Sequence, residues 1–350
     1  MDISVTGHIA SIPEEQFDRL DPAVGVVACY AKVKQREADG RWRVTYVHGT
    51  DGGQTKAAIP LYASYSANWS DPAYDPRAWG LPPAIREDCT AARCMVVEGY
   101  EDRCSGLHVD CSAREPPQLR QILAAMAQAA ARQDRWLSFP YFSSAARDAL
   151  SAAACGRIAW VLLGREAHIR DLADPGWESN LPKRVRYNLR HDRDLIASAG
   201  ITSKHCSWSE IEDTASELIA RHNIRKNQPD HPEFVRMRHR LWADCPQAEL
   251  VVFTARSPVV TGVETAVLWN NELDLREIGL AGEEGADRRA AYFDLVFRQP
   301  IAFAQSRGLQ RIRLGMGAEM VKTGRGAVLQ DLHGGVLTAS DARRFADEHY

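Results

Sequence analysis

The sequence predicts an α+β fold of two domains, in which mixed β-sheets are flanked by helices. The first observation is size: 350 residues, 45% of them apolar and 25% charged, suit a globular chain with two cores. The second is the apolar spacing, which changes between a period of two and a period of 3.6 within each half. The third is Asp174-Pro175-Gly176, a turn among few apolar residues. We therefore expect domains at 1–165 and 166–350.

The first half is expected to be rich in strands. Alternation of β-branched and aromatic residues predicts strands over 3–9, 24–30, 42–47 and 57–62, with two more at 135–139 and 157–163. Residues 66–90 contain four prolines and several aromatic residues, which predict an ordered loop. A helix should follow Pro116-Pro117, because Leu119, Ile122 and Met126 recur at helical spacing.

The second half starts with helices and then changes to strands. Asn180 can cap a helix that ends at Gly200, Ser209 and Glu212 have the spacing of a capping box, and a third helix is expected over 233–243. The period then becomes two over 249–255, 259–270 and 272–281, which predicts a three-stranded meander. A helix over 287–307, bent at Pro300, and a strand over 309–314 complete the half.

Composition excludes several classes of protein. The net charge of −3 is not that of a strongly basic nucleic-acid-binding domain. No apolar stretch is long enough to cross a membrane, and the N-terminus does not resemble a signal peptide, so we expect a cytoplasmic protein. The eight cysteines are expected to be free thiols. Cys89 with Cys94 and Cys104 with Cys111 lack the usual zinc spacing, and we expect no metal and no resident cofactor.

Basic residues concentrate on the first helix of the second half. Its cations, with two from the following helix, are candidates for binding phosphates of a nucleic acid, although a solvated helix face is an equal alternative. These residues are Lys183, Arg184, Arg186, Arg190, Arg193, Arg225 and Lys226, with Arg221 extending the patch.

A glycine-containing loop follows the predicted meander. Gly282-Glu283-Glu284-Gly285-Ala286 stands where backbone amides at a helix N-terminus could bind a pyrophosphate. An ordinary connection between strand and helix is an equal alternative. Two carboxylates lie where phosphates would bind, and this like charge disfavours coenzyme A as the acyl donor.

Two stretches resemble one known family. The segment Ala291-Tyr292-Phe293-Asp294, then Gly308-Leu309, then Gly315-x-x-x-Glu319-x-x-Lys322-x-x-Arg325-Gly326, resembles the closing region of the FemAB-like branch of the GNAT superfamily. The basic helix that begins Leu181-Pro182-Lys183 is also similar to that family. The resemblance implies tandem GNAT-like domains that transfer an acyl group, often aminoacyl from a charged tRNA, to an amine or hydroxyl. No helical arm of the kind some cell-wall members use is present, so we expect a small-metabolite acceptor in natural-product biosynthesis.

Several residues are candidates for the chemistry of such a transfer. Glu264 lies on the apolar middle strand of the meander, where its carboxylate either faces outward or acts as a base in a cleft, and Asp294 and Glu319 are alternatives for the base. Lys322 and Arg325 follow a strand in a glycine-rich loop, from which a cation can reach into a cleft. The expected substrate-binding residues are Trp69, Tyr292, Arg298 and Arg325, and the expected catalytic residues are Glu264, Asp294, Glu319 and Lys322.

Two other functions fit the same residues. An N-acyltransferase of the GNAT type would take its acyl group from coenzyme A instead of tRNA. A FemAB-like binding module would have lost catalysis altogether. The sequence leaves open the acyl group, the acceptor and the oligomeric state.

Overall fold

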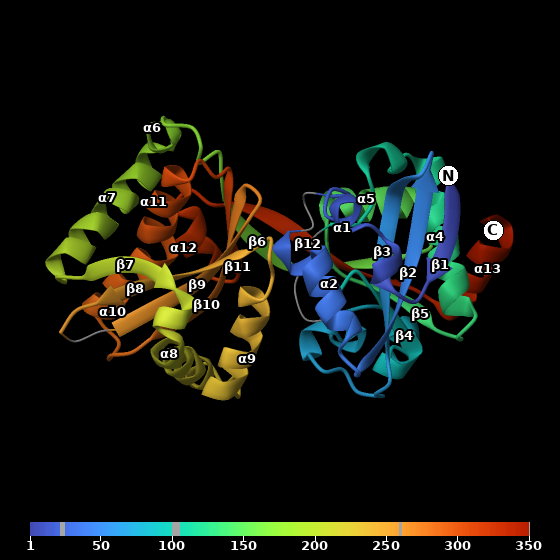
Figure 1. Ribbon diagram of the computed structural model, residues 1–350, viewed down its shortest axis with the longest axis horizontal. Coiled ribbons are helices and arrows are strands. Elements are labelled where there is room, and N and C mark those ends of the chain that lie inside the picture. The colour runs from blue at the N-terminus through green and yellow to red at the C-terminus, as the bar shows by residue number, and fades with distance from the viewer. Residues whose placement is uncertain (22–24, 100–105, 259–260, 350) are drawn as a thin grey trace. The chain divides into compact units, whose positions relative to one another are not determined.

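The chain folds into two compact units (Figure 1). The computed structural model describes residues 1–21, 25–99, 106–258 and 261–349. Unit 1 comprises Met1–Gly164 and Asp331–Tyr350, and unit 2 comprises Arg165–Gln330. Both combine a mixed sheet with helices, which confirms the predicted α+β class.

The division differs from the expected 1–165 and 166–350 in one respect. Residues 331–350 return to unit 1, because strand β12 (Val328–Leu337) pairs antiparallel with β5 (Trp136–Ser143). Helix α13 (Ala339–His349) then packs on α4 (Pro116–Ala131) and buries Phe345. The pairing joins segments far apart in the sequence, so no local pattern signals it.

Unit 1 has the strand order β1-β2-β3-β4-β5-β12, in which β4 and β5 are parallel. Its core forms around α4, whose predicted apolar stripe is buried. Its strands are β1 (Asp2–Thr6), β2 (Trp42–Asp51), β3 (Gln54–Ser64), β4 (Cys94–Val97), β5, the start of β6 (Ala159–Arg170) and the end of β12. Its other helices are α1 (Glu14–Phe17), α2 (Tyr30–Glu37), α3 (Pro83–Arg86) and α5 (Ser144–Ala153), with 3₁₀ turns at Ile9–Ser11, Val26–Ala28, Pro72–Tyr74, Pro76–Ala78, Ala91–Arg93 and Cys111–Ala113.

The prediction of a strand over 24–30 is wrong. Val26–Ala28 form a 3₁₀ turn, and Tyr30 begins α2, while residues 22–24 lie outside the described residues. The carboxylate of Asp18 accepts the Tyr30 backbone N–H at 2.7 Å, which fixes the start of α2. Val26, Val27 and Val33 are buried in this arrangement. Burial in the core therefore outweighs the strand propensity of these valines.

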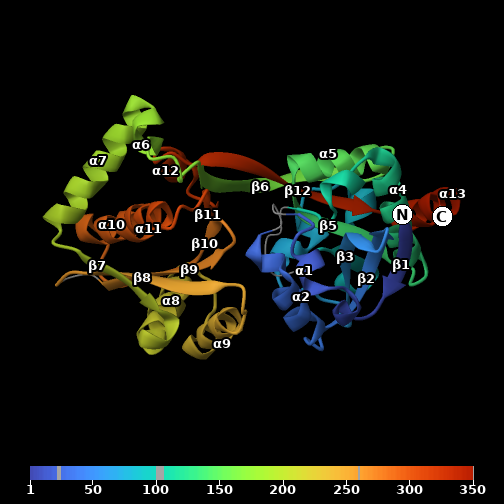
Figure 2. The same cartoon turned by 45° about the horizontal axis from the view of Figure 1, so that its top comes forward.

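Unit 2 has the strand order β6-β11-β10-β9-β8-β7. Helices α7, α10 and α11 cover one face of this sheet and α8 and α9 the other (Figure 2). Its strands are β7 (Thr202–Ser207), β8 (Glu249–Arg256), β9 (Thr261–Trp269), β10 (Glu272–Leu280) and β11 (Arg311–Met316). Its helices are α6 (Trp177–Asn180), α7 (Lys183–Ser198), α8 (Glu212–Arg225), α9 (Pro232–Ala243), α10 (Ala286–Phe293), α11 (Gln299–Ser306) and α12 (Glu319–Thr323), with a 3₁₀ turn at Trp208–Glu210.

Two details of unit 2 correct the sequence prediction. The capping box is formed by Ser207 and Glu210, not by Ser209 and Glu212, because β7 ends at Ser207 and the chain turns there. The expected bend at Pro300 is a π-helical turn, η8 (Asp294–Arg298), between α10 and α11. Pro300 has no N–H to donate to the carbonyl of Val296, and the wider turn accommodates that loss.

No helix of the described residues has both the length and the apolar character needed to cross a membrane.

The packing of β10 on α8 gives a stability prediction. A Cβ at Gly279 would lie 2.6 Å from the backbone of Leu218 and Ile219 in α8. We expect Gly279→Ala to destabilise the protein by about 1–3 kcal/mol, because neither backbone can move freely. Urea unfolding would measure the change. Gly285→Ala is the control, since nothing lies within 4 Å of a Cβ there; equal midpoints for the two variants would contradict the prediction.

Candidate active site

The candidate site lies where two parallel strands of unit 2 separate. β10 and β11 pair only between Glu272–Asp274 and Arg311–Arg313. Beyond that point β10 bulges between Leu275 and Glu277 and follows β9, whereas β11 follows β6 to Met316. Strands that part leave backbone N–H and C=O groups without a ladder partner, and such groups can bind a substrate.

Glu264 is a buried carboxylate on β9, where it stands opposite Ile278 of β10. Its exposure is 4%, and no hydrogen bond or ion pair among the described residues involves its carboxylate. Burial raises the pKa of Glu264 well above its ordinary value, the charge of Glu277 raises it further, and Lys322 and Lys226 partly oppose the shift. A carboxylate with a raised pKa and no hydrogen-bond partner is a better proton acceptor than an ordinary carboxylate.

Tyr292 of α10 lies close to Glu264. Burial raises the pKa of Tyr292 to about 12, and the negative charge of Glu264 contributes to the shift. The phenol is therefore protonated at neutral pH and can donate a hydrogen bond. Among the predicted catalytic and substrate-binding residues, Glu264 and Tyr292 are the two whose polar groups form no hydrogen bond or ion pair with the described residues.

Lys322 is buried and fully engaged with the backbone. Its ammonium donates to the carbonyls of Leu314, Gly315 and Met316 at 2.7, 3.0 and 2.9 Å. Three bonds use all three protons of an ammonium group. Lys322 therefore fixes the end of β11, and the catalytic role expected from the sequence would require its ammonium to leave these carbonyls.

Arg325 also holds the fold together. It forms a bidentate ion pair with the buried Asp192 of α7 at 2.8 and 2.9 Å. Its guanidinium carbon lies 4.1 Å from the centre of the Phe293 ring, a cation–π contact. These contacts hold the segment after α12 to α7 and α10, and the substrate-binding role expected from the sequence would require Arg325 to leave Asp192.

Asp294 is the centre of a closed hydrogen-bond network. Its carboxylate accepts from Arg298 Nε at 2.5 Å, Ser203 Oγ at 2.6 Å and Gln299 Nε2 at 2.8 Å. Arg298 also donates to Ser203 at 2.6 Å. This network connects the π-turn to β7 and stabilises a carboxylate that is fully buried. Asp294 is thus unsuited to be the base, and Arg298 retains only its exposed edge for a ligand.

Two further predicted residues, Glu319 and Trp69, are held by partners of their own. Glu319, the first residue of α12, forms a partly exposed ion pair with Arg165 at 3.2 Å. Trp69 belongs to unit 1, where its indole N–H donates to the carbonyl of Cys89 at 3.2 Å and its ring packs near Trp79. Trp69 therefore packs within unit 1, where it helps to hold the proline-rich loop.

A cation of α10, Arg288, contacts the glycine loop between β10 and α10. Arg288 Nη1 donates to the carbonyl of Gly282 at 3.0 Å, and its Nε lies 3.4 Å from Glu284. His222 of α8 is buried, and neither ring nitrogen has a hydrogen-bond partner among the described residues. Burial, together with the positive charges of Lys226, Arg288 and Arg225, lowers the pKa of His222 to about 4. Four basic side chains from α8 and α10 thus lie near one another beside this loop.

The cations of α7 fall into two groups. Arg186 donates to the carbonyl of Ser179, and Arg193 pairs with Glu178. Lys183, Arg184 and Arg190 are exposed, and no hydrogen bond or ion pair joins them to another described residue. Two exposed rings, Tyr187 and His191, lie parallel on the same helix at 6.4 Å. The free cations and the rings together form a surface suited to phosphates and bases.

No cluster of three potential metal-ligating side chains occurs in the described part of the chain, and Cys104 lies outside it.

Comparisons with known proteins identify the fold. No family model and no curated protein matches the sequence. The crystal structure of FemX matches with a TM-score of 0.64 at 9% identity, over 96% of this chain and 97% of that one. The chain has the FemX-like fold. This agrees with the predicted resemblance and with tandem GNAT-like domains.

Two further structures share the FemX-like fold. A protein of unknown function from Bacteroides thetaiotaomicron has a TM-score of 0.58 at 10% identity, over 96% of this chain and 100% of that one. The C-terminal domain of a protein named as a lysylphosphatidylglycerol synthetase from Agrobacterium fabrum has a TM-score of 0.52 at 12% identity, over 96% and 93%. At such identities the likeness establishes the fold, and the site must be judged from its own residues.

The raised pKa of Glu264 predicts a specific dependence of stability on pH. Because the folded-state pKa exceeds the unfolded value, the folded protein binds more protons, and the group's contribution to stability is lost as pH rises through the folded pKa. We expect Glu264→Gln to remove this loss. The urea midpoint of the variant minus that of the parent should therefore grow as the pH rises from about 5 to about 8. A difference that stays constant with pH would contradict a raised pKa.

Proposed function

We propose that the protein is an acyltransferase that moves an aminoacyl group from aminoacyl-tRNA to an amine or hydroxyl of a small metabolite in natural-product biosynthesis. The observation that carries the proposal is the buried, unpartnered carboxylate of Glu264 beside the protonated phenol of Tyr292. Together they provide a base and an acid at the separation of β10 and β11.

The transfer can be written with these two residues. Glu264 accepts a proton from the acceptor amine as the nitrogen attacks the ester carbonyl of the donor. Backbone N–H groups where β10 leaves β11 would stabilise the oxyanion that forms. The C–O bond of the ester then breaks, the ribose oxygen takes a proton from Tyr292, and the proton held by Glu264 returns the phenol to its starting state.

Two observations support a tRNA donor. Lys183, Arg184 and Arg190 are exposed cations without partners in the described chain, and the rings of Tyr187 and His191 lie among them. One structural neighbour is named for the synthesis of lysylphosphatidylglycerol, which is an aminoacyl ester. A small acceptor is supported by helix length, because the longest helices of the described residues, α4 and α7, have 16 residues and form no extended arm.

Coenzyme A is the alternative donor. Arg288 and the N-terminus of α10 could bind its pyrophosphate. The ion pair between Arg288 and Glu284 opposes this, because an incoming phosphate must displace a carboxylate that already occupies the cation.

Donor binding distinguishes the two substrates. Purified protein would be titrated with a pool of charged tRNA and, separately, with acetyl- and longer acyl-coenzyme A, each at low and raised salt. We expect tRNA to bind with a Kd of about 1 μM or tighter and to weaken steeply with salt. Binding of the thioesters without tRNA would contradict the aminoacyl proposal, and binding of neither donor would favour a module without catalysis.

The exposed face of α7 gives a mutational prediction. The triple variant Lys183→Gln/Arg184→Gln/Arg190→Gln should reduce the slope of log Kd against log salt by about 2–3, because each phosphate contact contributes roughly 0.7–0.9. The triple variant Arg19→Gln/Arg41→Gln/Arg93→Gln removes the same charge from exposed positions of unit 1. Equal slopes for the two variants would show that α7 does not contact the tRNA.

A further inference from the structure

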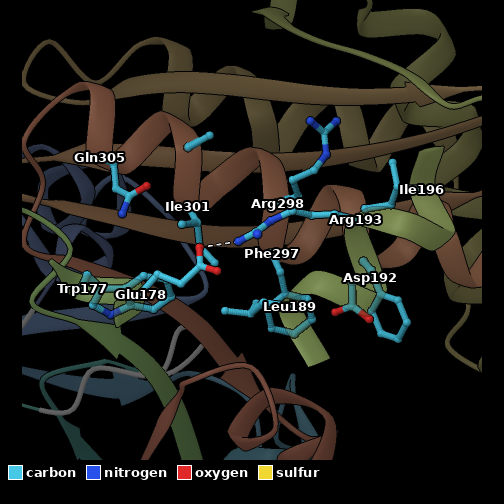
Figure 3. A pocket seen from close by; sticks show the side chains of 12 residues that line it. Trp177, Glu178, Leu189, Asp192, Arg193, Ile196, Phe297, Arg298, Ile301 and Gln305 are labelled. Carbon is cyan, nitrogen blue, oxygen red and sulfur yellow. Dashed lines mark hydrogen bonds and ion pairs between the residues drawn. The ribbon is translucent and has the colours of Figure 1, made fainter. Parts of the chain in front are cut away.

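A cavity of about 140 Å³ lies between α7 and the segment formed by η8 and α11 (Figure 3). Its wall includes the apolar side chains of Trp177, Leu189, Ile196, Phe297 and Ile301, and charged side chains lie beside them. It shares no residue with the pair Glu264 and Tyr292. The function proposed above therefore leaves this cavity without a role.

The size of the cavity limits what can enter it. An apolar cavity of about 150 Å³ is large enough to hold benzene. The space beside Leu189, Ile196 and Phe297 thus suits one phenyl ring or a branched aliphatic group of four carbons. A longer acyl chain would not fit.

Charges of both signs meet at the rim. Glu178 and Arg193 form an ion pair, and Figure 3 shows them reaching toward each other from opposite sides of the pocket. Both are accessible, with side-chain exposures of 41% and 48%. The other charged groups are engaged: Asp192 pairs with Arg325, and Arg298 is held by Asp294, although its side chain keeps 40% exposure.

An ion pair above an apolar cavity complements a zwitterion with an apolar side chain. The ammonium group of an α-amino acid can replace Arg193 at Glu178, and its carboxylate can replace Glu178 at Arg193, so that neither charge is left unpaired. The wall also includes Phe297 and Arg298 of the π-turn, and π-turns occur often at functional sites.

We propose that this cavity is a binding site for a free apolar α-amino acid of the size of leucine or phenylalanine. The side chain occupies the cavity, and the two charged groups separate the Glu178–Arg193 pair. The site connects α7, which presents the exposed cations, to the segment that follows Tyr292. Occupancy would therefore stabilise the packing of α7 on unit 2.

Calorimetric titration of the whole protein with L-leucine and L-phenylalanine tests the proposal without any acyl donor. We expect at least one to bind with a Kd of about 1 mM or tighter. Glycine lacks the side chain and should bind about 100-fold more weakly. L-Leucinamide and 4-methylpentanoate, which lack the carboxylate and the ammonium group, should each bind at least about 10-fold more weakly.

Two variants locate the site. Ala302 lines the cavity and is exposed, so Ala302→Phe should block the cavity and abolish binding while the protein stays folded. Ala197→Phe on the exposed side of α7 is the matched control and should bind normally. Circular dichroism would establish that both variants fold.

Three results would overturn the proposal. They are the absence of binding by both amino acids at about 10 mM, equal binding of 4-methylpentanoate and leucine, and unchanged binding by folded Ala302→Phe. The first result would show that the cavity binds no amino acid. The second would show that Glu178 does not bind the ammonium group, and the third would show that the ligand binds elsewhere.

Discussion

The architecture of unit 2 depends on one buried ammonium group. Lys322 binds three consecutive carbonyls at the end of β11, where Gly315, Gly317 and Ala318 have positive φ angles. Without this cation the carbonyls of Leu314, Gly315 and Met316 would lose charge-assisted hydrogen bonds, each of which contributes about 1.5–3 kcal/mol. The bonds fix the point at which β11 ends and turns into α12. They also position a positive charge near Glu264.

The candidate base depends on the same arrangement. Burial disfavours the ionised form of Glu264 and raises its pKa, and the positive charge of Lys322 partly opposes this shift. The charges of Arg325 and Asp294 are balanced by direct partners: Arg325 pairs with Asp192, and Asp294 accepts hydrogen bonds from Arg298 and Gln299. In contrast, Glu264 has no partner among the described residues, and a buried charge without a partner costs stability. Such a cost is typical of a residue retained for chemistry.

Local patterns in the sequence predict part of this structure. The apolar spacing of α7 is a local property, so this helix could be predicted from the sequence. The missing N–H of Pro300 is also local, so the irregular turn before Pro300 could be predicted as well. Ser207–Glu210 and Ser209–Glu212 have the same spacing, and only the end of β7 decides between them. The partners of Lys322, Arg325 and Asp294 depend on backbone turns and on distant segments, which explains why three expected site residues are structural. Glu264 was identifiable because a carboxylate interrupts an apolar strand.

The role of Glu264 as the group that accepts the proton of the acceptor can be measured through the pH dependence of kcat/KM for acyl transfer. The parent would be compared with Glu264→Gln, using the better-binding donor. We expect the rate of the parent to rise with pH through the raised pKa of Glu264, and the variant to lose this step and about 100- to 10,000-fold in rate. A variant that keeps the parent's rate and pH profile would show that Glu264 is not the base.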